Sequence, residues 1–140
     1  MVKISNLLSD KERNIDVNDS FDFIELSRKG LTIKQLHKIL DYTKLTIKDL
    51  PHIIALSERQ INRYEDHQVL RRDISAQLIR IVELYSKGYD VFEDEKKFQT
   101  WMNRKIRGLG NVEPKKLLDT TFGIQLVIDE LGRLEYGIIS

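Results

Sequence analysis

The residues of this chain that are able to do chemistry are few, and they do not gather into a catalytic pattern. The sequence contains no cysteine, which removes thiol nucleophiles and Cys-ligated metals from consideration. Its three histidines, His37, His52 and His67, lie at intervals of 15 residues, without further ligands at the spacing of a metal site. We interpret them as surface or partly buried side chains, and we predict neither a metal site nor a cofactor.

Two further groups of residues have types that could form a catalytic site. The segment 108–111, Gly-Leu-Gly-Asn, lacks the preceding strand and the spacing of a phosphate-binding loop, so we interpret it as a turn with positive φ angles. The acids near the C-terminus are Asp129, Glu130 and Glu135. Because Arg133 lies among them, a solvated ion-pair face is the favoured interpretation. We predict that the protein is not an enzyme.

Composition limits the class of protein. At 140 residues, with 41% hydrophobic and 32% charged residues, the chain has the profile of one globular domain or of two small modules. It contains no apolar run of the ~18 residues that a membrane span needs, and its N-terminus does not resemble a signal peptide. We therefore expect a cytoplasmic protein without a membrane partner.

The net charge limits how the chain would bind nucleic acid. It has 23 basic and 22 acidic residues, whereas a dedicated nucleic-acid-binding domain usually has a pI above about 9. Residues 71–110 hold nine Lys/Arg against six Asp/Glu, a net +3, and residues 111–140 hold three against five, a net −2. Any DNA contact must come from a local basic patch. We expect the protein to form a homodimer, which would present two copies of that patch.

The elements that position these residues are predicted to be helices. Residues 1–19 show no sustained periodicity and read as a flexible or peripherally packed arm. A first helix is expected from a cap at Ser20 to Gly30. Three more follow from caps and apolar faces: residues 32–40 with a Thr32/Gln35 capping box, 47–54 after Thr46, and 57–65 with a Ser57/Gln60 capping box.

The segments 47–54 and 57–65, joined by a three-residue turn after another helix, have the outline of a helix-turn-helix. The second helix of that motif presents its outward residues to the major groove, where Arg fits guanine and Gln or Asn fits adenine. A solvated polar face is the alternative interpretation. The predicted DNA-binding residues are Ser57, Arg59, Gln60, Asn62 and Arg63, with Arg71 and Arg72 placed to hold phosphates.

Two residues depart from that motif. Pro51 lies inside the first of the two helices, where its ring clashes with the carbonyl of Ile47 unless the helix begins nearer Pro51. Ala55 stands where a turn glycine is common. Either change would give a helix-turn-helix with weakened or lost DNA affinity.

The second half of the chain has the longest helical pattern. From a cap at Asp73 the 3.6-residue period continues through Gly88 to Phe92, so we predict one helix, with a stop at Gly88 as the alternative. Further helices are expected after Asp94, at Pro114 and after a cap at Thr120, the last with the stripe Ile124, Val127, Ile128, Leu131 and Leu134. No strand pattern is convincing, so the predicted fold is all-α with about eight helices.

The C-terminal tail ends in Ile138, Ile139 and Ser140 after a helix-terminating Gly137. Two β-branched apolar residues either fold back onto the core or enter a groove of a partner. Tyr136 and Arg133, just before them, are residue types enriched at interfaces.

The last fifty residues carry an ordered series of short motifs. These are Val91-Phe92-Glu-Asp, Phe98-x-x-Trp101, Leu109-Gly-Asn111, Pro114-x-x-Leu-Leu-x-Thr120, Gly123, and Leu131-Gly-Arg133 with Gly137. The series resembles the toxin-binding domain of Xre/MbcA/ParS-type antitoxins, with Glu93 and Asn111 replacing glycines of the family pattern. The resemblance covers residues 31–140 and includes an Xre-like helix-turn-helix.

The resemblance implies a type II antitoxin that neutralises a RES-domain toxin, which degrades NAD⁺. It implies that the last helix and tail cover the toxin's active site, that the protein dimerises, and that it represses its own operon. The toxin-binding residues would be Arg133, Tyr136, Ile138, Ile139 and Ser140. The corresponding division is an arm (1–19), a helix-turn-helix region (20–72), a linking helix (73–92) and a toxin-binding domain (93–140). The alternative is a stand-alone transcription regulator whose C-terminal half only dimerises.

Overall fold

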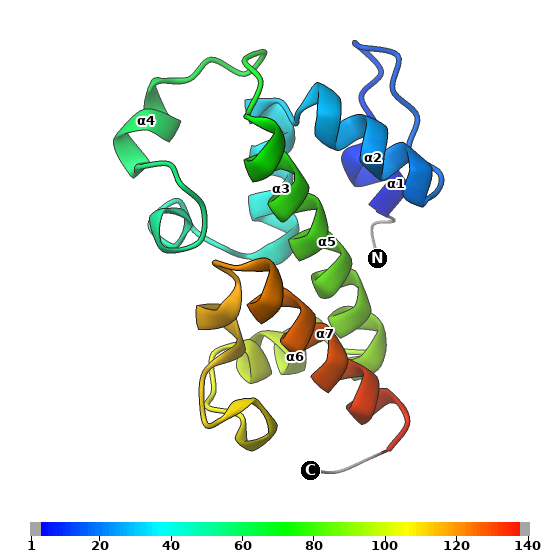
Figure 1. Ribbon diagram of the computed structural model, residues 1–140, viewed down its shortest axis with the longest axis vertical. Coiled ribbons are helices and arrows are strands. Elements are labelled where there is room, and N and C mark those ends of the chain that lie inside the picture. The colour runs from blue at the N-terminus through cyan, green and yellow to red at the C-terminus, as the bar shows by residue number, and fades with distance from the viewer. Residues whose placement is uncertain (1–3, 138–140) are drawn as a thin grey trace. The chain divides into compact units, whose positions relative to one another are not determined.

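The computed structural model describes residues 4–137, and within them it contains seven α-helices and three short 3₁₀ helices but no β-strand (Figure 1). The α-helices are α1 (Ile4–Leu8), α2 (Ser20–Lys29), α3 (Ile33–Thr43), α4 (Glu58–Arg63), α5 (Arg72–Phe92), α6 (Glu95–Met102) and α7 (Thr121–Glu135). The 3₁₀ helices are η1 (Leu50–His52), η2 (Arg107–Leu109) and η3 (Pro114–Leu117). The predicted all-α class is confirmed. None of the described helices is long and apolar enough to cross a membrane.

The chain divides into two compact units, the first ending at Val82 and the second beginning at Glu83. The division falls within α5, so each unit contains part of this helix. Buried apolar side chains are present in both units, and each unit is described separately below.

Local capping fixes where the helices of the first unit begin. The capping boxes predicted for α3 and α4 are both formed, because Thr32 and Ser57 each accept the amide N–H three residues ahead. The cap predicted for α2 is off by one residue. Asp19, and not Ser20, accepts the amide N–H of Asp22, whose own carboxylate accepts the amide N–H of Asp19.

The N-terminal segment is more deeply packed than its irregular sequence indicates. α1 is followed by a tight reversal that brings the backbones of Asp10 and Ile15 into an antiparallel bridge. Four apolar side chains of the segment are buried: Leu7, Leu8, Ile15 and Val17. The sequence prediction assigned none of these residues to the core, because their spacing follows neither a helical nor a strand period.

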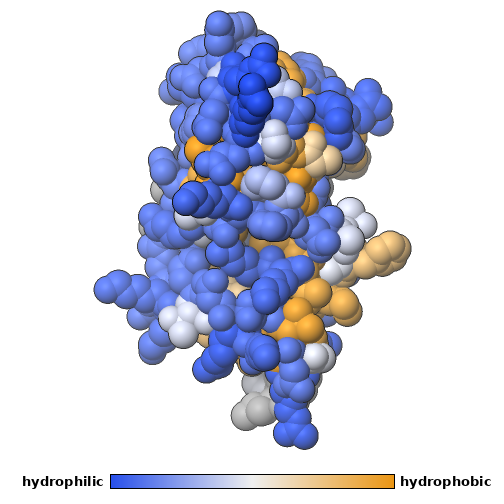
Figure 2. Space-filling model, turned by 90° about the vertical axis from the view of Figure 1, so that its left-hand side faces the viewer, coloured by the Kyte–Doolittle hydropathy of each residue, from blue (hydrophilic) through white to orange (hydrophobic). Residues whose placement is uncertain are grey.

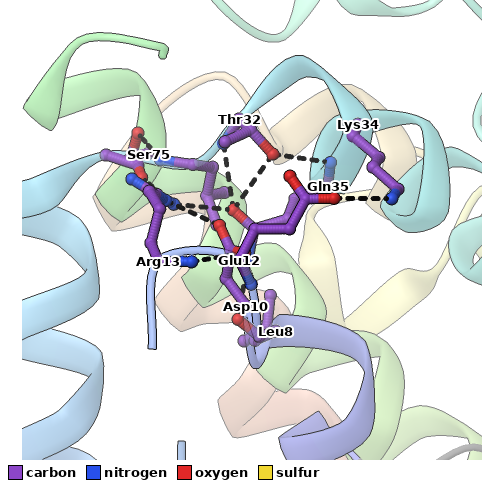
Figure 3. Close-up of polar contacts among 10 residues, drawn as sticks. Leu8, Asp10, Glu12, Arg13, Thr32, Lys34, Gln35 and Ser75 are labelled. Carbon is purple, nitrogen blue, oxygen red and sulfur yellow. Dashed lines mark hydrogen bonds and ion pairs between the residues drawn. The ribbon is translucent and has the colours of Figure 1, made fainter. Parts of the chain in front are cut away.

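One arginine joins this segment to α3 (Figure 3). The Arg13 guanidinium donates to a carboxylate oxygen of Asp10 at 2.6 Å, to the carbonyl of Gly30 at 2.9 Å, and to the side chain of Gln35 at 3.2 Å. Gln35, itself buried, donates in turn to the carbonyl of Leu8 at 2.8 Å. The network therefore connects the N-terminal segment to the end of α2 and the first turn of α3.

The first turn of α3 also receives the segment that precedes α5. The amide N–H groups of Ile33 and Lys34 donate to the carbonyls of Gln68 and Asp66, at 2.9 and 3.0 Å. Ser75 of α5 accepts the amide N–H of Leu31 at 2.9 Å. The N–H groups at a helix N-terminus have no intrahelical partners. Here residues of the segment before α5 and of α5 itself accept these hydrogen bonds.

The α-helix predicted over residues 47–54 does not form, and this prediction was wrong; the alternative of a helix that begins nearer Pro51 is what the structure shows, as the short 3₁₀ helix η1. Thr46 and Asp49 instead exchange side-chain hydrogen bonds with each other's amides, and only η1 follows. The physical reason is Pro51, which lacks an N–H and whose ring is incompatible with a preceding α-helical turn. Leu50, Ile53 and Ile54 are nevertheless buried, as their apolar pattern indicated.

In the second unit α5 continues without a break through Gly88, as predicted. Position 88 requires glycine, because a Cβ there would lie 2.1 Å from the ring of Phe98 on α6. The missing side chain therefore leaves the space that the Phe98 ring fills. Glycine makes helix formation less favourable in free energy than alanine would. Burial of the Phe98 ring, which has no exposed surface, offsets this loss.

Phe98 is the centre of an aromatic cluster. Its ring meets those of Tyr85 and Tyr89 edge-on, with centroids 5.4 and 5.3 Å apart, and it also contacts Phe92 and Trp101 at 5.6 and 6.0 Å. Edge-to-face and offset contacts at these distances are the favoured geometries for aromatic pairs. The Tyr89 hydroxyl accepts from the side chain of Gln99, so its polar end is also satisfied.

The remaining elements follow the predicted signals. Gly110 and Asn111 both adopt positive φ, which produces the predicted turn after η2. Pro114 begins η3, although that element is a 3₁₀ and not an α-helix. Thr120 caps α7 by accepting the amide N–H of Gly123 at 3.0 Å. The predicted α7 stripe is buried at Ile124, Val127 and Leu131 and half-buried at Ile128 and Leu134.

Replacing Asp10 by Asn is expected to destabilise the first unit in a pH-dependent way. Burial raises the pKa of Asp10, but the hydrogen bonds and charge of Arg13 and the amide of Glu12 outweigh it, so the pKa lies below its ordinary value. This stabilisation is present above the unfolded-state pKa of about 3.9 and is lost as pH falls through the lower, folded value. We expect a loss of about 1–2 kcal/mol at pH 7, measured by urea unfolding.

Asp41→Asn is the matched control, since Asp41 is exposed and should tolerate the change at every pH. Equal unfolding free energies for Asp10→Asn and the unmodified chain at pH 7 would contradict the role given to the Arg13 network.

Candidate functional site

The predicted toxin-binding residues lie at the end of α7. Tyr136 follows the helix with 79% of its surface exposed. Arg133 is partly exposed, and its Nε and Nη2 donate to one oxygen of Glu130 at 3.0 and 2.7 Å. The other three predicted residues, Ile138, Ile139 and Ser140, lie outside the described part of the chain. Arg133 is thus held in a fixed orientation by an acid one helical turn before it.

The acid that holds Arg133 was misjudged from the sequence. Glu130 was expected on a solvated face, yet only 2% of its surface is exposed. Its carboxylate lies against Gly108 of η2, where a Cβ would come within 2.3 Å of Oε1. Packing of α7 against η2 buries the position, so the ion pair with Arg133 is partly shielded from water. Asp129 and Glu135 are exposed, as predicted.

α7 has a second stripe that the sequence prediction missed. Phe122 and Leu126 are 83% and 52% exposed, although both are large and apolar. They recur with Asp129, Arg133 and Tyr136 at intervals of four, three, four and three residues, which places all five on one side of the helix. We call these five residues the α7 outer face. Figure 2, a view of one side of the molecule, shows apolar residues in orange reaching the surface between hydrophilic ones.

The signal for this face was present in the sequence. Phe122 and Leu126 are one turn apart and fall outside the buried stripe of Ile124, Val127 and Leu131. A helix with apolar residues on two opposite sides has one side for its own core and another for a second surface.

A close backbone contact sets the position of α7. A Cβ at Gly123 would lie 1.9 Å from the carbonyl oxygen of Leu117, so the first turn of α7 packs directly on η3. Together with the Thr120 cap, this contact fixes the start of the helix that carries the outer face.

The predicted DNA-binding residues of α4 are on the surface but are not all available. Arg59, Asn62 and Arg63 are exposed and line a shallow groove with Glu58. Ser57 and Gln60 instead use their side-chain oxygens to cap the helix. Of the predicted residues of α4 and its cap, only Arg59, Asn62 and Arg63 have side chains that make no hydrogen bond or ion pair within residues 4–137.

The two arginines predicted to hold phosphates differ in their surroundings. Arg71 forms an exposed ion pair with Asp73, at 3.2 Å, and its hydrogen bond lowers the pKa of that carboxyl. Arg72, the first residue of α5, is exposed. A phosphate at Arg71 would have to compete with Asp73, although exposed pairs of this kind are weak.

No metal-binding cluster is present among the described residues. His37, His52 and His67 are all exposed and lie on different segments. No three His, Asp or Glu side chains within residues 4–137 come together as ligands.

Similarity to known proteins identifies the kind of protein to which these surfaces belong. Residues 87–137 match the family described as the antitoxin Xre/MbcA/ParS C-terminal toxin-binding domain. Antitoxin Xre of Photorhabdus laumondii is 32% identical over 114 residues, which cover 80% of this chain and 77% of that protein. The chain belongs to the Xre/MbcA/ParS-type antitoxin family. Antitoxin Xre of Yersinia enterocolitica is 27% identical over 119 residues, which cover 84% of this chain and 80% of that relative.

This antitoxin is therefore a component of a toxin–antitoxin system, with a cognate toxin as its partner. The resemblance found in the sequence is confirmed. Membership in an antitoxin family indicates a regulatory role.

The motif residues of the antitoxin are mainly scaffold. Trp101 is buried in the aromatic cluster, Pro114 begins η3, and Thr120 and Gly123 position α7. The exposed Phe122 and Leu126 are not part of the motif series. The family pattern therefore specifies how the helix is held more than which side chains it presents.

Gly123→Ala is expected to destabilise the antitoxin by about 1–3 kcal/mol, the range for overpacking a tight contact. The added methyl group would overlap the Leu117 carbonyl, which is backbone and cannot rotate away. Urea unfolding at pH 7 measures the change.

Gly132→Ala is the matched control on the same helix. A Cβ there would meet nothing closer than the Lys87 amine at 3.7 Å. Because Ala favours a helix over Gly by about 1 kcal/mol, this variant should be as stable as the unmodified chain or more so. The same sign for both variants would refute the packing explanation.

Proposed function

We propose that the antitoxin neutralises a RES-domain toxin, an enzyme that degrades NAD⁺, by covering its active site with α7 and the C-terminal tail. The observation that supports this most directly is the α7 outer face, which combines exposed aromatic and aliphatic side chains with an oriented arginine. The proposal places the protein in the cytoplasm, where NAD⁺ is consumed by such a toxin.

The chemistry of this face suits a protein partner. Phe122 and Tyr136 expose large rings, and aromatic residues with Arg supply most hot spots at protein interfaces. Arg133 is held by the buried Glu130, so fewer of its rotamers are lost when a partner binds. The α7 outer face thus has apolar anchors and a preorganised charge.

The tail would complete the occlusion. Ile138, Ile139 and Ser140 follow the exposed Tyr136 after one glycine, Gly137, and the two β-branched apolar residues gain most by leaving water. In our proposal they enter the toxin's NAD-binding cleft, while Phe122 and Leu126 dock on its surface. Inhibition then requires no catalysis by the antitoxin.

Deleting residues 138–140, or adding several residues after Ser140, should release NAD⁺-degrading activity of the co-expressed toxin. Combined Phe122→Ala and Leu126→Ala changes should weaken capture of the toxin at least tenfold, which is ~1.4 kcal/mol. The two readouts are cellular NAD⁺ content and the affinity of the purified pair.

Phe21→Ala provides the control, because Phe21 is as exposed as Phe122 but lies on α2. It should leave both readouts unchanged. If both tail variants inhibit as well as the unmodified chain, the tail has no role in occlusion, and if Phe122→Ala/Leu126→Ala binds normally, docking occurs elsewhere.

We further propose that the antitoxin, as a homodimer, represses its own operon through α4. Arg59, Asn62 and Arg63 are exposed and unoccupied, and a dimer would present two such sets to a palindromic operator. Because η1 replaces the first helix of a helix-turn-helix, the support of α4 differs from that motif. The alternative is a stand-alone regulator whose C-terminal unit only dimerises. Co-expression with the neighbouring gene and pull-down distinguishes the two.

Replacing Arg59 and Arg63 together by Ala should abolish the mobility shift of the antitoxin's own promoter DNA. Each guanidinium can form two hydrogen bonds with a guanine, and each such pair is worth about 1–3 kcal/mol of discrimination. Arg28→Ala with Lys38→Ala removes the same charge from other exposed positions and should leave the preference for promoter over random DNA intact. Equal promoter binding by both double variants would exclude α4 as the recognition helix.

A further inference from the structure

A second cationic surface lies in the C-terminal unit, away from α4 in the sequence. Residues 96–112 contain five Lys/Arg and no Asp or Glu, in a chain whose net charge is only +1. The five are Lys96, Lys97, Arg104, Lys105 and Arg107, and all are exposed. The toxin-docking and operator-reading roles proposed above use none of them.

Three of these cations converge on one groove. Lys96, Lys97 and Arg104 line it together with Thr100, and the rings of Phe92 and Trp101 form its floor. Its volume is about 340 Å³. Lys96 and Thr100 are one turn apart on α6, and Arg104 reaches the same groove from the turn that follows the helix.

The groove cations have no internal partners among residues 4–137. Other cations of the same unit are paired, such as Lys116 with Glu113 at 3.3 Å and Arg133 with Glu130 at 2.7 Å. Lys96, Lys97 and Arg104 form no ion pair and no side-chain hydrogen bond with described residues. The exposed acids Glu93, Asp94 and Glu95 precede Lys96 directly in sequence but form no ion pair with these cations.

We propose that this groove binds the sugar-phosphate backbone of DNA. Three adjacent unpaired cations can each replace a counterion at a phosphate, and release of these counterions drives the binding. The Thr100 hydroxyl already donates to the carbonyl of Lys96 at 2.9 Å, so the three cations supply the contacts to phosphate. Such contacts would add affinity without sequence preference.

An acidic protein segment is a less suitable occupant. Trp101 is only 4% exposed and Phe92 is half-buried, so the floor offers little apolar area to a docking side chain. Stable protein interfaces bury about 800 Å² on each partner, whereas phosphate contacts act one charge at a time. The groove therefore offers three cations but too little apolar area for a stable protein interface.

The test compares two triple variants of the full chain. One replaces Lys96, Lys97 and Arg104 by Gln, and the other, a control with the same change in charge, replaces Lys11, Lys38 and Arg28 by Gln. Fluorescence anisotropy measures binding to a promoter duplex and to a random duplex at several salt concentrations, and the same variants are titrated with the purified toxin. Each lost phosphate contact lowers the steepness of log K against log[salt] by about 0.9, so the groove variant should lose about 2.7 on both duplexes.

The use of both duplexes separates this proposal from operator recognition. If the chain binds both equally, operator reading by α4 fails, yet the effect of the groove variant on the salt slope still tests the groove. Unfolding curves check that both variants are folded.

Three results would overturn the proposal. They are an unmodified chain that binds neither duplex at low salt, a groove variant whose salt slope matches that of the control variant, and a groove variant that loses affinity only for the toxin. The last result would instead assign the groove to an acidic protein surface.

Discussion

The C-terminal unit depends on the contact between the Phe98 ring and Gly88. This contact brings α6 against α5 and places one ring in contact with four others, so that most of the unit's aromatic surface leaves water together. α6 then contacts η3, and η3 receives α7 through the Gly123 backbone contact. α7 is thus positioned by a series of contacts that begins at Gly88, where a side chain is missing.

This arrangement separates the residues that hold α7 from those that α7 presents. The holding residues are buried or make backbone contacts, which leaves little tolerance in their size. Phe122, Leu126 and Tyr136 of the outer face are exposed, so packing within the unit does not determine these residues. Glu130 connects the two roles, because it is buried with the scaffold and orients the exposed Arg133.

The N-terminal unit is organised differently, by polar bonds across segments that have little regular structure. Arg13 and Gln35 connect the N-terminal segment to α3, and the carbonyls of residues 66 and 68 satisfy the start of the same helix. Pro51 removes the helix that would normally support α4. Support for α4 therefore comes from its own capping box and from the burial of Ile61.

The sequence by itself determined the features that depend on neighbouring residues. The capping boxes of Thr32 and Ser57, the turn at Gly110 and Asn111, the Thr120 cap and the buried α7 stripe could all be predicted, because each needs only a few adjacent residues. The ordered C-terminal motifs likewise identified the family. Only the tertiary structure decided that Leu8 and Val17 belong to the core, that Glu130 is buried, and that Lys96, Lys97 and Arg104 share a groove. These outcomes depend on which segments distant in sequence pack together, and neither hydrophobic period nor residue type specifies that packing.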